Sequence, residues 1–346
     1  MTGLAELLHD RLDDVPVPPA DLDRVEQQGR RIRRRRRAPL VVGAVVLVAV
    51  AGYALRPGGA DDRSERRIDP IGRLDFGDGL RAYADPGRVV HLGDRTVPAA
   101  DLEALDTDAA ATPFGIVFYA DGVPMLLEES GDSVPLQPGA ERGDFLPTSK
   151  ADSVNPWVAY GATVDGQPTV VVRDLARGTV VATHPVPGDT VIDALDDGVV
   201  FLRTGEGTTV WDPATDTESD LAGPRTSVAD VRGGVVLYDG QRPSGPAAPA
   251  YRLVEGAIDA QLTFDGAHVL YWSNRLEPTD GGDPIVLDHQ GTFFAVDTDG
   301  SILMAGSQRG APGDTFYDCE VPSGTCVELG TLRMTGGDPM FIGVDM

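Results

Sequence analysis

The chain has 346 residues, of which 41% are hydrophobic, and a formal net charge of −25 at pH 7. This length and composition allow one large packed domain or two smaller ones, and they exclude a disordered chain. The acidity lies beyond residue 38: residues 1–38 hold 9 basic and 7 acidic side chains, whereas the rest of the chain holds 20 basic and 47 acidic ones. Because so acidic a body repels polyphosphates, we expect no nucleic acid partner.

An arginine block directly precedes an apolar run in the N-terminal part of the chain. The block consists of Arg30, Arg31, Arg33, Arg34, Arg35, Arg36 and Arg37. From Ala38 to Leu55 there is no charged residue. A helix of about 18 residues is roughly 27 Å long, which is enough to cross a hydrocarbon core. We therefore predict a transmembrane helix over residues 38–55.

A buried core helix and a cleaved signal peptide are the alternatives for this run. A core helix seldom lacks any polar stripe over five turns, and the basic region of a signal peptide is rarely preceded by some thirty residues of mixed sequence. The flank richer in arginine stays cytoplasmic. The sequence thus predicts a single-pass protein of the cell membrane, with residues 1–37 cytoplasmic and the C-terminal domain extracytoplasmic. The arginine block would also contact anionic lipid headgroups.

The cytoplasmic segment, residues 1–37, contains one short amphipathic pattern. Leu4, Leu7, Leu8 and Leu12 fall on one face of a helix that ends before a proline-rich stretch. A segment this short cannot bury the leucine face by itself, so this face needs the bilayer surface, a second copy or another protein as a partner. The alternative is a partly ordered tail that needs no partner.

The order of leucine helix, proline break, arginine block and single anchor resembles bitopic proteins of high-GC bacteria that are encoded beside extracytoplasmic-function sigma factors. The resemblance covers residues 1–55 and implies a regulatory protein partner for the cytoplasmic helix.

After a linker over residues 56–69, residues 70–346 carry short apolar runs at a recurring spacing. Most successive runs begin 33 to 42 residues apart. The seven runs begin at Val89, Ile116, Val158, Val199, Val235, Val269 and Ile302. Most follow a turn signal such as Asp-Gly or Gly-Gly, which supplies the positive φ that a tight hairpin needs. Continuous apolar strands of this length are buried on both faces, as the second strand of a propeller blade is.

A second repeated element places an aspartate at the end of a strand, before a short turn and a further strand. Trp211-Asp212 has this pattern, and Arg173-Asp174 and Tyr317-Asp318 are looser versions of it. In these pairs the sequence resembles WD40-like and YVTN-type β-propellers. The resemblance implies an all-β fold for residues 70–346.

The two ends of this domain are predicted to share one blade. The stretch "DPMFIGV" at residues 338–344 has the pattern of a blade's first strand, and residues 80–98 can provide the outer strands. A shared blade removes exposed strand edges. We therefore predict a β-propeller of seven blades, with six as the alternative because the first two apolar runs are only about 27 residues apart.

The only two cysteines, Cys319 and Cys326, flank the stretch "EVPSGT". A hairpin turning at Pro322-Ser323-Gly324 brings their Cβ atoms face to face, and the predicted topology places them in an oxidising compartment. We predict a cross-strand disulfide. A redox-active pair usually needs a closer CxxC spacing, and a metal site needs two further ligands.

No catalytic motif is present: the five histidines are scattered singly, and the numerous aspartates fit hairpin turns. The stretch "DTDG" at residues 297–300 also fits a turn better than a calcium loop. We therefore predict no catalytic, cofactor-binding or metal-binding residue. The favoured function is binding of an extracytoplasmic ligand or protein. A hydrolase or lyase that uses carboxylates gathered at the central channel is the competing hypothesis, and a scaffold without a small ligand is a third.

Overall fold

The computed structural model describes residues 79–85, 89–92, 95–98, 109–128, 130–137, 148–257, 260–271, 273–307, 313–332 and 340–342. The chain divides into two units, Met1–Glu65 and Arg66–Met346, and every described residue belongs to the second. The predicted cytoplasmic segment, transmembrane helix and linker lie outside the described residues. Within the described ranges, no helix is long and apolar enough to cross a membrane.

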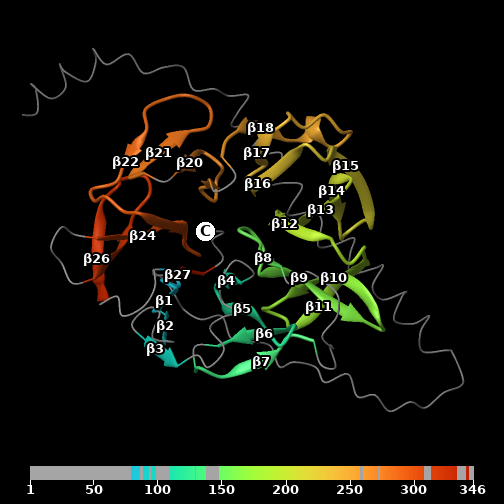
Figure 1. The fold of residues 1–346 in the computed structure, drawn as a ribbon, viewed down its shortest axis with the longest axis horizontal. Coiled ribbons are helices and arrows are strands. Elements are labelled where there is room, and N and C mark those ends of the chain that lie inside the picture. Colours follow the sequence, from blue (N-terminus) through green and yellow to red (C-terminus); the bar gives the residue numbers. More distant parts are fainter. Residues whose placement is uncertain are drawn as a thin grey trace, which may run out of the picture. The chain divides into compact units, whose positions relative to one another are not determined.

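The second unit consists of seven small sheets whose innermost strands surround a common centre (Figure 1). It is a seven-bladed β-propeller. Each strand list below runs from the innermost strand outward. Blade 1 consists of β27 (Met340–Phe341), β1 (Tyr83–Asp85), β2 (Val89–Leu92) and β3 (Arg95–Pro98). Blade 2 consists of β4 (Ala110–Thr112), β5 (Gly115–Ala120), β6 (Val123–Leu127) and β7 (Ser133–Pro135).

Blades 3, 4 and 5 follow in chain order. Blade 3 consists of β8 (Ser149–Ala151), β9 (Trp157–Val164), β10 (Gln167–Asp174) and β11 (Thr179–Pro185). Blade 4 consists of β12 (Val191–Asp196), β13 (Val199–Thr204), β14 (Gly207–Asp212) and β15 (Thr217–Ala222). Blade 5 has three strands: β16 (Thr226–Arg232), β17 (Val235–Gly240) and β18 (Arg252–Glu255).

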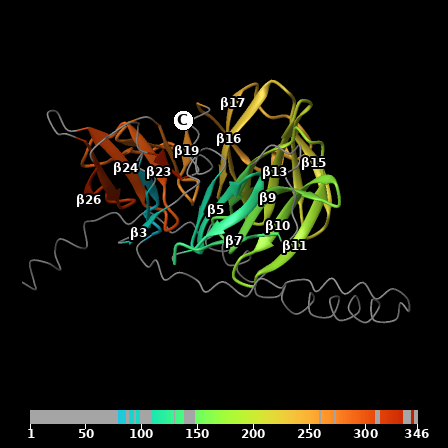
Figure 2. The same ribbon diagram turned by 60° about the horizontal axis from the view of Figure 1, so that its bottom comes forward.

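Blades 6 and 7 complete the ring. Blade 6 consists of β19 (Gln261–Leu262), β20 (His268–Leu270), β21 (Arg275–Pro278) and β22 (Ile285–Val286). Blade 7 consists of β23 (Phe293–Val296), β24 (Ile302–Ser307), β25 (Asp314–Cys319) and β26 (Cys326–Leu332). Strand lengths differ around the ring: β9 and β10 have eight residues each, whereas the strands of blades 6 and 1 have two to four (Figure 2).

The predicted tight turns between the first and second strands of blades 4 and 5 are present. Asp197 and Gly198 have φ values of 50° and 83°, and Gly233 and Gly234 have values of 59° and 77°. Two successive residues with positive φ form the kind of turn whose twist matches that of the two strands it joins. Asp-Gly and Gly-Gly therefore occur where the backbone requires them.

Apolar side chains pack between neighbouring blades rather than in one central core. The described residues form seven buried apolar clusters, and each cluster joins one blade to the next. In the second strands, Val158, Tyr160, Val200 and Phe201 are fully buried, because these strands have a blade on either side. We call each packing interface between neighbouring blades a seam.

The ring is closed by the pairing predicted from the two ends of the domain. β27 pairs antiparallel with β1, with Tyr83 opposite Phe341 and Ala84 opposite Met340. The C-terminal segment therefore provides the innermost strand of blade 1, and the N-terminal part of the domain provides the other three.

Blade 5 departs from the regular pattern. β18 pairs parallel with β17, and the connection between them bonds to the outermost strand of blade 4 through Gly245 N–H to the Leu221 carbonyl (2.9 Å) and Ala247 N–H to the Asp220 carbonyl (2.9 Å). This connection contains three prolines and the 3₁₀ helix η2 (Ala248–Ala250). Because proline lacks an N–H, the stretch cannot form a regular return strand, and the chain crosses over instead.

Candidate functional site

Among the described residues, four of the innermost strands have an aspartate within two residues of their C-terminal end. These inner-end aspartates are Asp152, Asp196, Asp230 and Asp297, in blades 3, 4, 5 and 7. All the innermost strands run in the same direction along the central axis of the ring. Their C-terminal ends therefore lie on the same face of the propeller. The ends of the inner strands therefore gather carboxylates, as the hydrolase or lyase hypothesis requires.

In blades 3 and 4, these carboxylates bind the backbone of the next blade. Gly198 N–H, from the turn of blade 4, donates to Asp152 Oδ2 (2.7 Å). Gly233 N–H and Gly234 N–H, from the turn of blade 5, donate to the two oxygens of Asp196 (3.2 Å each). The aspartate of one blade thus satisfies the turn amides of the following one.

At two more seams an aspartate accepts backbone amides of the next blade that lie outside such a turn. Leu262 N–H of blade 6 donates to Asp230 Oδ2 (2.9 Å). Leu80 N–H and Arg81 N–H, at the start of blade 1, donate to Asp297 Oδ1 (3.2 Å) and Oδ2 (2.8 Å). Hydrogen bonds to a charged carboxylate are the stronger kind, and each one here joins two blades.

Close backbone approach at these turns requires glycine at defined positions. A Cβ on Gly79 would collide with the Asp297 carboxylate, and a Cβ on Gly233 would lie 2.5 Å from the Asp265 carbonyl oxygen. Both glycines also have positive φ. Glycine therefore permits the approach of the Asp297 carboxylate at Gly79 and of the Asp265 backbone at Gly233.

Arg232, the last residue of β16, joins three blades at the same end of the ring. Its Nη1 donates to the carbonyl of Ala151 in blade 3 (3.3 Å), and its guanidinium carbon lies 5.2 Å from the centroid of the Phe264 ring in blade 6. Its Nε lies 3.4 Å from Asp230 Oδ1. A side chain of blade 5 that reaches blades 3 and 6 supports the ring from inside.

The electrostatic surroundings differ between Asp196 and Asp297. Burial raises the pKa of Asp196, while the amides of Gly234 and Gly233 and the charge of Arg232 act in the opposite direction, and the charge of Asp152 adds to the rise. Burial raises the pKa of Asp297 to about 6, against the effect of its backbone hydrogen bonds, and the charges of Asp299 and Asp318 raise it further. Of these two aspartates, only Asp196 has a cation, Arg232, among the groups that shift its pKa.

These bonds define what the inner-end aspartates can do chemically. A general acid or base needs an oxygen free to face a substrate. Both oxygens of Asp297 accept backbone N–H groups, and so do both oxygens of Asp152 and Asp196 when the turn amides of their own blades are included. Proton transfer at any of them would compete with a hydrogen bond that joins two blades, so the arrangement favours a structural role for these carboxylates.

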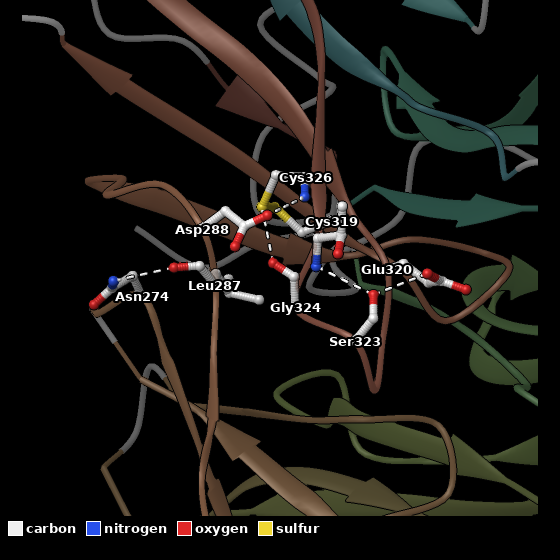
Figure 3. The surroundings of a disulfide bond; sticks show 9 residues. Asn274, Leu287, Asp288, Cys319, Glu320, Ser323, Gly324 and Cys326 are labelled. Carbon is white, nitrogen blue, oxygen red and sulfur yellow. Dashed lines mark hydrogen bonds between the residues drawn. A yellow bond between two sulfur atoms is a disulfide. The ribbon is translucent and has the colours of Figure 1, made fainter.

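The predicted disulfide between Cys319 and Cys326 is confirmed. It joins the end of β25 to the start of β26, where the two residues are direct cross-strand partners, with an S–S distance of 2.09 Å (Figure 3). The arginine block, Arg30 to Arg37, lies outside the described residues.

The loop closed by the disulfide also contacts blade 6 (Figure 3). Asp288 N–H donates to the Gly324 carbonyl (3.0 Å), and Cys326 N–H donates to Asp288 Oδ2 (3.4 Å). The disulfide therefore holds the loop that joins blade 7 to blade 6 at the outer rim.

No group of three or more His, Cys, Asp or Glu side chains is placed to hold a metal ion in the part of the chain that the structure describes. Residues 297–300 form a turn: Gly300 N–H donates to the Asp297 carbonyl (2.9 Å), and Asp297 N–H donates to the Ser301 carbonyl (2.8 Å).

No protein-family model matches the chain, and no curated protein sequence matches it significantly. Similar solved structures include TolB from Acinetobacter baumannii, with a TM-score of 0.38 and 10% identity over 75% of this chain and 65% of TolB. Another is an oligogalacturonate lyase from Vibrio parahaemolyticus, with a TM-score of 0.40 and 10% identity over 61% of this chain and 76% of the lyase. A quinonprotein alcohol dehydrogenase-like protein from Bacteroides thetaiotaomicron has a TM-score of 0.29 and 10% identity over 71% of this chain and 57% of its own.

The chain thus spans just under two thirds of the TolB structure. Similarity at this level assigns no ligand or activity to the chain.

The sequence predicted the aspartates as turn residues or, in the competing hypothesis, as channel carboxylates of an enzyme. The structure gives four of them a second role, as acceptors for the backbone of the next blade. The sequence offers only a partial signal, an aspartate near the C-terminal end of the inner strand in several blades, and it does not identify the amides that these aspartates accept.

Proposed function

We propose that this protein presents a rigid β-propeller on the outer side of a membrane, where it binds a ligand or a protein without catalysis. The observation that carries the proposal is the use of the inner-end aspartates as acceptors between blades. Because backbone amides occupy these carboxylates, a partner would bind the surface loops, which the ring holds in a fixed position.

The membrane location in this proposal rests on the sequence. The arginine block beside a charge-free run supports a retained anchor with a cytoplasmic N-terminus. The disulfide adds support, since such bonds persist mainly in oxidising compartments.

A cytoplasmic partner completes the proposal. The leucine face of residues 1–37 needs a binding surface, and the resemblance of residues 1–55 to proteins encoded beside sigma factors suggests a regulatory protein. Binding outside would then be relayed through the single helix as a change in its association.

The experiment is double tagging of the full chain, followed by antibody labelling of cells without their wall. We expect the C-terminal tag to be labelled on intact cells and the N-terminal tag only after permeabilisation. Cross-linking in the same cells should then capture a protein through the N-terminal segment. The opposite labelling pattern, or a C-terminal tag that is labelled only after permeabilisation, contradicts the proposal.

One observation favours the alternative, an extracytoplasmic hydrolase or lyase. The raised pKa of Asp297, about 6, is the kind of value found in catalytic acids. If the purified protein cleaves a substrate, and Asp297→Asn abolishes that cleavage while Asp196→Asn retains it, the binding proposal is overturned.

A further inference from the structure

Blade 5 has three strands in the part of the chain that the structure describes, whereas the other six blades have four. Its outermost strand, β18, occupies the position of a third strand (Figure 1). The third strands of blades 3, 4 and 7 are mostly buried. In β18, by contrast, Arg252 and Glu255 are exposed, and Leu253 and Val254 are only half-buried. Among the described residues, no fourth strand covers the outer edge of β18.

The outer edge of β18 also has unused backbone groups. The N–H groups of Arg252 (3.0 Å) and Gly256 (2.9 Å) donate to carbonyls in and next to β17. Alternate residues of a strand direct their backbone to the same neighbour, so Leu253 and Glu255 direct their N–H and C=O groups outward. Neither of these two N–H groups has an acceptor among the described residues. The edge of β18 can therefore pair with one more strand.

The charges around this edge favour a basic partner. Glu255 lies in β18 itself, Asp239 lies in the neighbouring strand β17, and both side chains are exposed. Asp280 and Asp283, between β21 and β22 of blade 6, are exposed as well. Arg252 Nη1 lies 3.7 Å from Asp280 Oδ2, so this part of blade 6 adjoins β18. These four acids outnumber Arg252, and they would attract the lysine or arginine side chains of an added strand.

The length and charge of the edge also decide between two possible occupants. A second copy of the chain would bring two strongly acidic domains together. It would also pair through a strand of only four residues, which is too short to bury the about 800 Å² per partner of a stable interface between rigid bodies. An extended segment of another protein avoids both restrictions, because it can be basic and can follow the rim beyond β18.

We propose that the outer edge of β18 binds an extended, basic segment of a partner protein, which adds the fourth strand of blade 5 by backbone pairing with Leu253 and Glu255. This inference rests on the proposed binding role and deepens it, because it names a binding surface and the kind of segment that fits it. In this mode of recognition the main-chain hydrogen bonds provide affinity, and the side chains beside the added strand provide specificity.

The test is binding of a synthetic octapeptide of alternating lysine and valine to the full-length protein in phosphatidylcholine nanodiscs, measured by calorimetry against empty nanodiscs. Glu255→Pro removes an outward N–H that the fold does not use, which an edge strand tolerates. Glu255→Ala removes the same carboxylate but keeps this N–H. We expect the proline variant to bind roughly 10-fold more weakly than the alanine variant. Asp280→Asn should weaken binding about 2-fold, and less at high salt.

A second measurement keeps the test valid if Glu255→Pro fails to fold. The same peptide with every backbone amide N-methylated keeps its charge but cannot donate a hydrogen bond, so it should not bind to the unmodified protein. The unmethylated peptide should slow hydrogen exchange at the amides of Leu253 and Glu255.

Lack of binding by the unmethylated peptide overturns the proposal. So does equal affinity in the two Glu255 variants, or binding of the methylated peptide, because either result shows attraction to an acidic surface without strand pairing. Self-association that Glu255→Pro abolishes would assign the edge to a second copy and would also overturn it. Because the peptide is added to purified protein, these results are independent of the membrane orientation and the cytoplasmic partner, which the double-tagging experiment tests.

Discussion

The seam between blades 4 and 5 and the seam between blades 7 and 1 are built on the same plan. Each has a buried aspartate that accepts two backbone N–H groups of the next blade, and each has aromatic packing beside it. They differ in charge: Asp196 has both Arg232 and Asp152 nearby, whereas the charged groups that shift the pKa of Asp297 are Asp299 and Asp318. The same kind of backbone contact therefore has different charged surroundings at the two seams.

The two seams differ also in how the chain crosses them. Between blades 4 and 5 the chain continues directly, and the connection at residues 241–251 adds packing against β15. Between blades 7 and 1, the described backbone pairing across the ends of the domain is two residue pairs of β27 and β1. The closing seam should therefore be the more sensitive of the two.

The largest expected effect comes from removing an aromatic ring at each seam. Phe316→Ala and Phe201→Ala should each lower the free energy of unfolding by about 3–5 kcal/mol, because both side chains are buried to at least 99%. Denaturant unfolding measures this loss. Only Phe316→Ala should also increase hydrogen exchange at residues 340–342; an equal increase in Phe201→Ala would contradict the proposed difference between the seams.

The disulfide at the seam between blades 6 and 7 offers an intermediate case. Replacing both Cys319 and Cys326 by serine should cost about 2 kcal/mol, since the bond closes a short loop. Denaturant unfolding under non-reducing conditions tests this. Hydrogen exchange should increase in residues 320–326 and at Asp288. If protection from exchange is lost only in distant blades, the loop does not hold this seam.

Removing an inner-end carboxylate should have a comparable or smaller effect. Asp196→Ala leaves the amides of Gly233 and Gly234 without an acceptor, and we expect a loss of about 1–3 kcal/mol. Asp297→Ala should cost less at pH 7.5 than at pH 5.0, because it also removes a carboxylate whose ionisation is unfavourable in the closed seam. Thermal unfolding at the two pH values compares them, and an identical cost at both would argue against the charge difference between the seams.

The smallest effect is expected from Asp299→Asn. This exposed side chain adds repulsion to Asp297 while its oxygen accepts the N–H of Ser301 (2.8 Å), a contact that asparagine can keep. We expect stabilisation within about 0.5 kcal/mol at pH 7.5. A destabilisation of more than that, measured by denaturant unfolding, would mean that Asp299 has a further role at the seam.

Much of the fold could be predicted because it depends on local patterns. The apolar runs and Asp-Gly or Gly-Gly turns predict the blades, the stretch at residues 338–344 predicts the shared blade, and the spacing of Cys319 and Cys326 predicts the disulfide. The three prolines at residues 243–249 are also a local signal for the irregular blade 5, but the crossover they produce depends on packing against blade 4.

The candidate site could not be predicted in the same way. The partners of Asp152, Asp196 and Asp297 are backbone amides 46, 37 to 38 and 216 to 217 residues away. Any residue except proline can supply such an amide, so the contact leaves no motif. The contact of Arg232 with Ala151, over 81 residues, is equally non-local.

The most direct test of the account is a map of hydrogen exchange in three single variants, Asp152→Ala, Asp196→Ala and Asp297→Ala, under native conditions. If these aspartates hold neighbouring blades together, each variant should raise exchange in the start of the following blade: at Gly198, at Gly233 and Gly234, and at Leu80 and Arg81. The other two seams should remain as protected as in the unmodified protein. Exchange that is unchanged in all three variants, or raised equally throughout the ring, would contradict the account.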